Sequence, residues 1–243
     1  MNNTADNQTF QQVLDGSWLM FKASEVNADG ATITSSGFDL TAWMNATVPG
    51  TVLTNLVQNG IYPDPYIAEN NNLIPDIYNV GRDFYTYWFY TTFELPAAGK
   101  EQNAWLEFRG INYSAHVFLN GVQITSTPIQ GMFLRHVLDI TRVANFGSIN
   151  SLAVIIYPVN NPGNVANGGQ GGDEQIGKDV TAQYVEGWDW IIPIRDRNTG
   201  IWDQVSVITA GPVVINDPYV VTKGITFQGT TKNAESAGPP TPA

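Results

Sequence analysis

A chain of 243 residues, of which 43% are hydrophobic, can bury a substantial core, and this excludes an intrinsically disordered protein. Its formal net charge of −11, with no basic stripe, excludes nucleic acid as a partner. The absence of cysteine excludes disulfides and cysteine-ligated zinc, and no apolar run reaches membrane-spanning length. An acidic surface of this kind tolerates neutral or cationic ligands best.

Strand patterns dominate the chain. Aromatic and β-branched residues between turn residues predict strands in the runs 17–21, 84–95, 104–108, 115–119, 122–124, 132–138, 151–157, 204–209 and 213–221. Asn120-Gly121 joins two of these runs, and because both residues tolerate a positive φ, it predicts a type I′ hairpin. Many short strands with little helix predict an all-β protein with a jelly-roll β-sandwich fold.

One short helix and two long loops interrupt the strands. Thr51 is placed to cap the helix, an apolar stripe follows it, and Asn59-Gly60 is placed to end it. The segments 62–81 and 158–179 are rich in Pro, Asp, Asn and Gly. Because irregular segments of this length are uncommon inside a compact domain, we interpret both as functional or disordered loops.

The segment 184–203 carries the chemistry that best indicates a function. Asp189 lies between Trp188 and Trp190. Indoles stack on the apolar C–H face of a pyranose, and a carboxylate accepts hydrogen bonds from its hydroxyl groups. The motif therefore favours a sugar site. The alternative from the residues alone is structural, with Trp188, Trp190 and Trp202 as core aromatics and Asp189 paired with Arg195 or Arg197.

Other candidate sites carry weaker signals. Glu186 and Asp189 invite a catalytic pair, but most glycosidases present their two carboxyl groups from different strands. The run 168–172 is glycine-rich, yet it lacks the Lys-Ser/Thr of a phosphate-binding loop, which favours a flexible loop. His116 and His136 lie in separate strand runs without a second ligand nearby. We therefore expect no metal site, no cofactor and no catalytic residue in this chain.

The chain resembles the N-terminal sugar-binding domain of glycoside hydrolase family 2, in the branch of exo-β-D-glucosaminidases and mannosylglycoprotein endo-β-mannosidases. The resemblance covers residues 15–222. The residues that carry it are Trp43, Ala46 to Leu53, Asn59 to Tyr66, Tyr87 to Phe89, Phe108 to Tyr113, Leu119 to Gly121, Gly131 to Phe133 and Gly187 to Asp203.

This resemblance implies a galactose-binding-like jelly roll that leans against a catalytic (β/α)₈ barrel. In the family, the barrel carries the two glutamates of a retaining mechanism, and the N-terminal domain lends loops to the rim of the sugar subsite. The resemblance gives Asp189 the role of hydrogen-bonding the non-reducing sugar and Trp188 or Trp190 that of an aromatic wall. Asn70, in a looser match, lies where relatives offer an asparagine to the same sugar.

The resemblance also implies a domain organisation. Residues 1–14 are an N-terminal extension, 15–222 are the sugar-binding domain, and 223–243 are a linker or the truncated start of an immunoglobulin-like domain. A (β/α)₈ barrel takes about 250 residues. The barrel and its glutamates are therefore expected outside this chain, which is predicted to be inactive alone.

The leading hypothesis is thus a non-catalytic domain of a retaining β-glycosidase. Its expected partners are an oligosaccharide of β-linked glucosamine or mannose type and a catalytic barrel in the parent protein or a partner chain. No nucleic acid and no membrane is expected. The rival hypotheses are a stand-alone carbohydrate-binding module, a docking domain for a separate catalytic chain, and an enzyme that uses Glu186 and Asp189. Composition does not fix the compartment, and an extracytoplasmic location is favoured.

Overall fold

The structure is a computed structural model that describes residues 9–75, 80–98, 101–159, 179–182, 198–215, 218–227 and 230–233. It divides into two compact units, Met1–Pro212 and Val213–Ala243. The second unit contains the antiparallel hairpin of β15 (Gly224–Phe227) and β16 (Thr230–Asn233). No helix within the described ranges is long and apolar enough to cross a bilayer.

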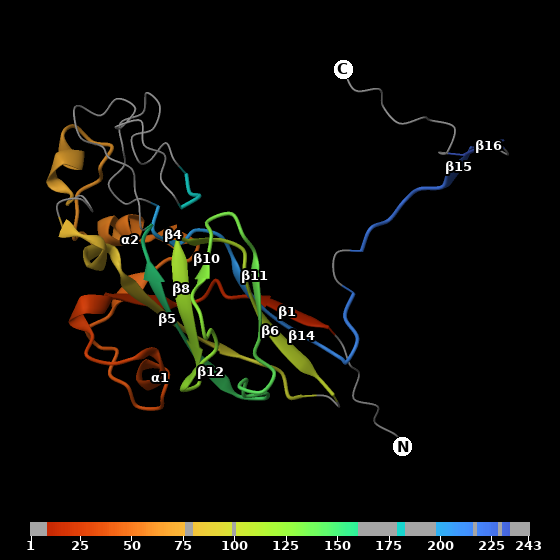
Figure 1. Ribbon diagram of the computed structural model, residues 1–243, viewed down its shortest axis with the longest axis horizontal. Coiled ribbons are helices and arrows are strands. Elements are labelled where there is room, and N and C mark those ends of the chain that lie inside the picture. Colours follow the sequence, from red (N-terminus) through yellow and green to blue (C-terminus); the bar gives the residue numbers. More distant parts are fainter. Residues whose placement is uncertain are drawn as a thin grey trace. The chain divides into compact units, whose positions relative to one another are not determined.

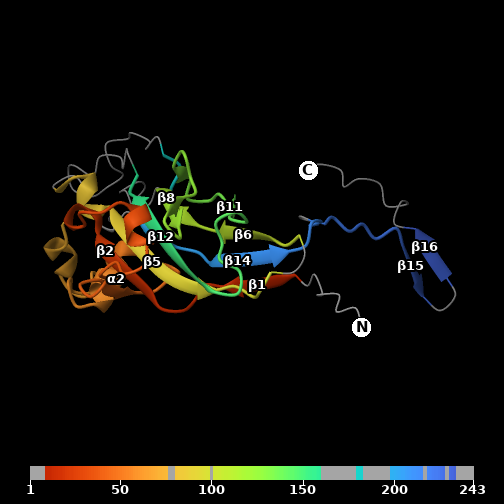
Figure 2. The ribbon, with the colours of Figure 1, turned by 90° about the horizontal axis from the view of Figure 1, so that it is seen from below.

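Two sheets form the layers of the first unit (Figures 1 and 2). A four-stranded sheet has the order β1-β14-β6-β11, and a seven-stranded sheet has the order β10-β8-β12-β5-β2-β3 with β9 paired to β8. The strands of the first sheet are β1 (Phe10–Val13), β6 (Asn103–Phe108), β11 (His136–Asp139) and β14 (Val205–Ala210). Those of the second are β2 (Trp18–Lys22), β3 (Met44–Ala46), β5 (Tyr87–Glu94), β8 (Ser114–Leu119), β9 (Val122–Gln123), β10 (Ile129–Gln130) and β12 (Ile149–Tyr157).

The main core lies between these two sheets. Alternate residues of β6 are buried, as expected for a strand with one face on a core. Leu106 of β6 and Val207 of β14 belong to the same buried cluster as Phe89 of β5 and Val154 of β12. This arrangement confirms the prediction of an all-β sandwich.

A second apolar cluster covers the other face of the seven-stranded sheet. Trp88 of β5 and Phe118 of β8 pack there with Trp43 and with Ile33 of the short helix α1 (Gly30–Ile33). The backbone of α1 approaches the sheet so closely that a Cβ on Gly30 would lie 2.2 Å from the Phe118 ring. Residues 87–90 of β5 and 152–156 of β12 are buried or partly buried on both faces, and these stretches read as continuous apolar runs rather than as alternating ones.

The predicted hairpin and helix are confirmed. Asn120 and Gly121 have φ values of 50° and 83°, and Leu119 pairs with Val122 across the turn. The helix is α2 (Val52–Gln58); Thr51 caps it and Asn59 ends it. Thr51 Oγ1 accepts a 3.1 Å hydrogen bond from the Thr54 backbone N–H, and the Thr54 side chain closes a capping box.

Other predictions need correction. The described residues of 213–221 form no strand. In the run 132–138, a strand begins only at His136, because residues 132–134 form a turn. The four-residue helix α1 is too short to produce an apolar period, and the sequence did not predict it. β1 lies within the segment 1–14 that the sequence assigns to an extension, and all four of its residues pair with β14.

The remaining elements lie around the sandwich. They are the 3₁₀ helices η1 (Ala23–Glu25), η2 (Asn70–Leu73) and η3 (Arg82–Tyr85), and the short strands β4 (Gly50–Thr51), β7 (Ile111–Asn112) and β13 (Gly200–Ile201). The three short strands pair in the order β4-β13-β7. In Figure 1, β4 lies between the labels of α2 and β10.

Candidate functional site

The small sheet β4-β13-β7 is the base from which the predicted sugar-binding segment leaves the sandwich. Gly200 pairs with Thr51 on one side and with Asn112 on the other. The Thr199 carbonyl accepts a 2.7 Å hydrogen bond from the Val52 backbone N–H, at the start of α2. Asn112 and Thr199 are fully buried. The chain is therefore fixed where it returns to the sandwich after residue 197.

The chain is also fixed where it leaves the sandwich. The Thr181 hydroxyl donates to Asn112 Oδ1 at 3.0 Å and lies 3.2 Å from Met132 Sδ. The Ala182 backbone N–H donates to the same sulfur at 3.2 Å. Because Asn112 pairs with Gly200 and also accepts from Thr181, both ends of the segment 183–197 start beside this one asparagine.

Of the predicted site residues, only Asn70 lies within the described part of the chain. Trp188, Asp189 and Trp190, and the alternative acid Glu186, lie outside the described residues. Asn70 begins η2 and is partly buried. Its Nδ2 donates to the Asp64 carbonyl at 3.0 Å, which folds the loop back on itself. Within the described part of the chain no hydrogen bond to its Oδ1 is present, so this oxygen remains able to accept one.

Trp202 belongs to the scaffold around the base. Its side chain packs on Met132 and Ala182, and its Nε1 donates to the Met132 carbonyl at 2.9 Å. The backbone of Gly110 lies against the indole, since a Cβ there would be 2.5 Å from Trp202 Cε2. For Trp202, this packing fits the structural interpretation of the motif rather than a sugar-contacting one.

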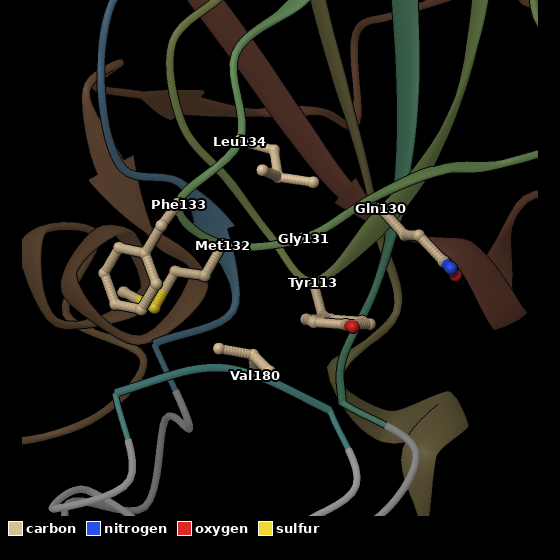
Figure 3. Close-up of a pocket in the computed structure, with 7 residues that line it drawn as sticks. All are labelled: Tyr113, Gln130, Gly131, Met132, Phe133, Leu134 and Val180. Carbon is tan, nitrogen blue, oxygen red and sulfur yellow. The ribbon is translucent and has the colours of Figure 1, made fainter.

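A pocket opens beside the same base (Figure 3). It has a volume of about 330 Å³ and is lined by Tyr113, Gln130, Gly131, Met132, Phe133, Leu134 and Val180. The sequence predicted a strand over Met132, Phe133 and Leu134, and therefore did not identify the pocket. The available signal was Gly131, whose φ of 114° suits glycine and interrupts the run between β10 and β11.

The side chains that line the pocket carry no charge at physiological pH. Burial, followed by the nearby Asp179 carboxylate, raises the pKa of the Tyr113 phenol above its ordinary value of 10.0. Tyr113 is therefore a neutral aromatic side chain at physiological pH. The described ranges contain no cluster of three His, Asp or Glu residues that could hold a metal ion.

His136 begins β11, two residues after Leu134 of the pocket. Its titration makes the stability of the fold depend on pH. Burial lowers the pKa of its imidazole below the ordinary value of 6.5, opposed by a hydrogen bond with the Gln130 backbone. Its Nε2 is buried and has no partner among the described residues. Folding thus favours neutral histidine, so its contribution to stability is complete above pH 6.5 and is lost as pH falls through the lower folded pKa.

We therefore expect His136→Asn to flatten the acid limb of the stability curve. Asparagine keeps a short polar side chain but has no proton to take up in this range. Chemical denaturation at intervals from about pH 7 to pH 5 measures the effect, because the unfolded wild type gains a proton that the folded protein resists. If stability falls with pH equally steeply in the wild type and in His136→Asn, then His136 has the same pKa in the folded and unfolded states.

Comparison with known proteins identifies the class of domain. A family model described as glycosyl hydrolase 2 galactose-binding domain-like matches residues 21–203. The match includes the base, the pocket and the segment between Ala182 and Asn198. The chain belongs to this family, and the resemblance inferred from its motifs is confirmed.

Individual relatives agree with this assignment. The mannosylglycoprotein endo-beta-mannosidase of Lilium longiflorum is 49% identical over 216 residues, which cover 87% of this chain. The exo-beta-D-glucosaminidase of Streptomyces avermitilis is 33% identical over 201 residues, or 82% of this chain. The crystal structure of the Amycolatopsis orientalis exo-chitosanase CsxA covers 88% of this chain with a TM-score of 0.69 and 25% identity.

This chain spans only a part of these proteins. It covers 22% of the lily protein, 20% of the Streptomyces protein and 22% of the CsxA chain. The relatives are glycosidases, and the domain that they share with this chain makes up about a fifth of each.

Proposed function

We propose that this chain is a non-catalytic sugar-binding domain of a retaining β-glycosidase, which lends residues to the rim of a sugar subsite. Asp189 accepts hydrogen bonds from the sugar hydroxyls, Trp188 or Trp190 provides an aromatic wall, and Asn70 contributes its free amide oxygen. The catalytic barrel lies outside this chain, in the same polypeptide or in a partner. The chain alone is expected to hydrolyse nothing.

One observation supports this proposal above the others. The segment that carries Asp189 starts and ends at a buried, hydrogen-bonded base around Asn112. A binding residue needs such support, because a side chain held in place loses less conformational entropy when the ligand arrives.

The proposed sugar is β-linked glucosamine or mannose. The activities of the relatives, an endo-beta-mannosidase and exo-beta-D-glucosaminidases, support this class. The net charge of −11 favours the cationic glucosamine oligomer. If that preference is electrostatic, affinity for chitosan oligosaccharides falls as salt rises, whereas affinity for manno-oligosaccharides does not. A flat salt dependence for both would remove the charge argument.

Docking to the catalytic barrel is a second role for this chain, and the loop around Asn70 supports it. Four large apolar side chains of this loop are exposed: Ile61 by 57%, Tyr66 by 78%, Ile67 by 59% and Leu73 by 67%. Exposed apolar groups gathered on one loop are typical of surfaces that contact another polypeptide. This surface would serve a barrel in the parent polypeptide and a barrel in a partner chain alike.

The test is the effect of Asp189→Ala on sugar binding. Chitosan and manno-oligosaccharides are titrated into the purified chain by calorimetry. Hydrogen bonds to a charged group contribute about 1.5–3 kcal/mol, so the variant should bind about 10- to 100-fold more weakly. Asp15→Ala is the matched control, because Asp15 is exposed and the charge change is the same. Equal affinity in the two variants would refute a role for Asp189.

A further inference from the structure

The outer face of the four-stranded sheet carries apolar side chains that no core uses. Leu106 of β6 and Val207 of β14 belong to the main core, so by alternation their neighbours Trp105 and Ile208 lie on the opposite face of the sheet. Within the described part of the chain, Trp105 and Ile208 belong to no core cluster, and both are partly exposed. A ligand from solution can therefore reach them.

Strand register places four side chains of this face in one row, which we call the Trp105 row. Gln11 of β1 lies opposite Ile208. Ile208 lies opposite Trp105, and Trp105 lies opposite Asp139 of β11. Figure 2 shows the four strands side by side in this order. Since neighbouring strands are about 4.8 Å apart, the row is about 14 Å long.

The Trp105 row has the chemistry that a pyranose ring requires. Its middle, Trp105 and Ile208, is apolar, and its two ends, Gln11 and Asp139, are polar and exposed. A pyranose has an apolar C–H face that stacks on an indole, and its hydroxyl groups need hydrogen-bond partners beside the ring. An amide and a carboxylate at the ends of an aromatic platform supply both kinds of contact.

Charges around the row largely cancel. Hydrogen bonds from the Thr141 hydroxyl and from its backbone N–H, the latter 2.9 Å from Asp139 Oδ1, lower the pKa of Asp139, and the charge of Arg142 adds to this effect. In the next row, Glu107 Oε1 lies 3.9 Å from Arg135 Nε. Because each carboxylate has a guanidinium group in its surroundings, binding to this face owes little to net charge.

The size of the face favours a saccharide over a protein. Two rows of outward-facing side chains cross all four strands, the Trp105 row and the row of Val13, Ser206, Glu107 and Val137. At the usual strand spacing they cover roughly 150 Å². Each partner in a standard protein complex buries about 800 Å². This face alone is therefore too small to hold a protein, and a single extended saccharide chain matches its width.

We propose that the outer face of the four-stranded sheet binds an extended polysaccharide of β-linked glucosamine or mannose. One ring stacks on Trp105, Ile208 extends the apolar surface, and Gln11 and Asp139 hydrogen-bond the hydroxyl groups. The sugar class rests on the proposed function, whereas the position of this site rests on the described strands alone. The site is additional to the one assigned to Asp189.

The experiment measures co-sedimentation of the purified chain with insoluble chitosan and with insoluble β-mannan. It is done at about 1 M salt, where the screening length falls to about 3 Å and the net charge contributes little. Stacking that removes about 50 Å² of apolar surface from water corresponds to about tenfold in affinity. We expect Trp105→Ala to bind one or both polymers about tenfold more weakly, and Trp105→Phe to retain binding. The two polymers distinguish the glucosamine chain from the mannose chain.

Matched variants assign the loss to this face. Tyr219→Ala is the control for removing an aromatic side chain, because Tyr219 is 91% exposed and lies in the second unit. Asp139→Asn should weaken binding several-fold, since a carboxylate makes the stronger hydrogen bonds, whereas Glu94→Gln on the seven-stranded sheet should not. Ile208→Thr keeps a β-branched side chain in the strand and carries the same test if Trp105→Ala fails to fold.

Binding that survives both Trp105→Ala and Ile208→Thr would overturn the assignment, as would equal losses in Asp139→Asn and Glu94→Gln. A wild-type dimer that Trp105→Ala dissociates would overturn it in favour of a second copy of the chain. Trp105→Ala should weaken polymer binding in an Asp189→Ala background as well. Failure at Trp105 therefore leaves the Asp189 proposal standing, and failure of Asp189→Ala to affect short oligosaccharides overturns the proposed function without removing this face.

Discussion

Gly200→Ala is expected to destabilise the first unit by about 3–5 kcal/mol, a large part of the stability of an ordinary domain. Gly200 has a φ of 150°, which L side chains rarely adopt, and its neighbours leave no room. A Cβ there would lie 2.5 Å from the Gly50 carbonyl oxygen and 2.7 Å from Thr51 Cα. Both are backbone atoms of the paired strand β4, so the clash can be relieved only by separating β13 from β4.

The consequence reaches the proposed sugar site because β13 follows the segment that carries Asp189. Displacing Gly200 also disturbs its pairing with Asn112, which holds Thr181 at the other end of that segment. We therefore expect Gly200→Ala to weaken sugar binding even at temperatures where the protein remains folded. Guanidinium denaturation measures the stability, and calorimetric titration of the folded variant measures the binding.

Gly60→Ala separates the two causes. Gly60 follows α2 with a φ of 71°, but nothing lies within 4 Å of a Cβ built there. It therefore reports the cost of the backbone conformation alone, about 1–2 kcal/mol. If Gly200→Ala costs no more than Gly60→Ala, then close packing of β13 on β4 does not hold the base together.

Local signals in the sequence were sufficient wherever neighbouring residues decide the structure. Asn120-Gly121 forms its turn because both residues accept a positive φ, and Thr51 starts α2 because its side chain satisfies a helix N–H. These are interactions within four residues along the chain. The strand runs at 104–108 and 151–157 were equally readable, since burial on a sheet imposes its pattern directly.

Features that depend on distant residues were not readable. The turn at Met132 is fixed by a hydrogen bond from Trp202 and by its sulfur accepting from Ala182, residues that are 70 and 50 positions away. Strands β4, β7 and β13 have two residues each and exist only because they pair with one another. No local pattern distinguishes such pieces from loop.

The candidate site shows the same division. The sequence indicated Asp189 and its flanking indoles, because a motif of unusual composition is visible without a structure. It did not indicate Asn112 or Thr181, since a single Asn or Thr in a β-rich chain carries no signal until its partner is known. Their mutual hydrogen bond and their burial reveal them as the support of the site.

Trp18→Ala is expected to cost about 4–5 kcal/mol, the upper range for truncating a buried aromatic side chain. Trp18 is 1% exposed and fills the core from β2. It also connects the two sheets: its Nε1 donates to the Leu14 carbonyl at 2.7 Å, and the Leu14 N–H donates to the Val205 carbonyl of β14 at 2.8 Å. Removing the indole leaves both a cavity and a buried carbonyl without its donor.

Trp18→Phe distinguishes these two contributions. Phenylalanine refills most of the cavity but cannot donate to Leu14, so a loss of about 1–3 kcal/mol is expected from the unsatisfied carbonyl and the remaining space. Guanidinium denaturation of the wild type and both variants gives the comparison. Because the core joins the layers that carry the base of the proposed sugar site, sugar binding by either variant should fall only in step with its unfolded fraction. Loss of binding by a fully folded Trp18→Phe protein would instead show that the link from β2 to β14 positions the site.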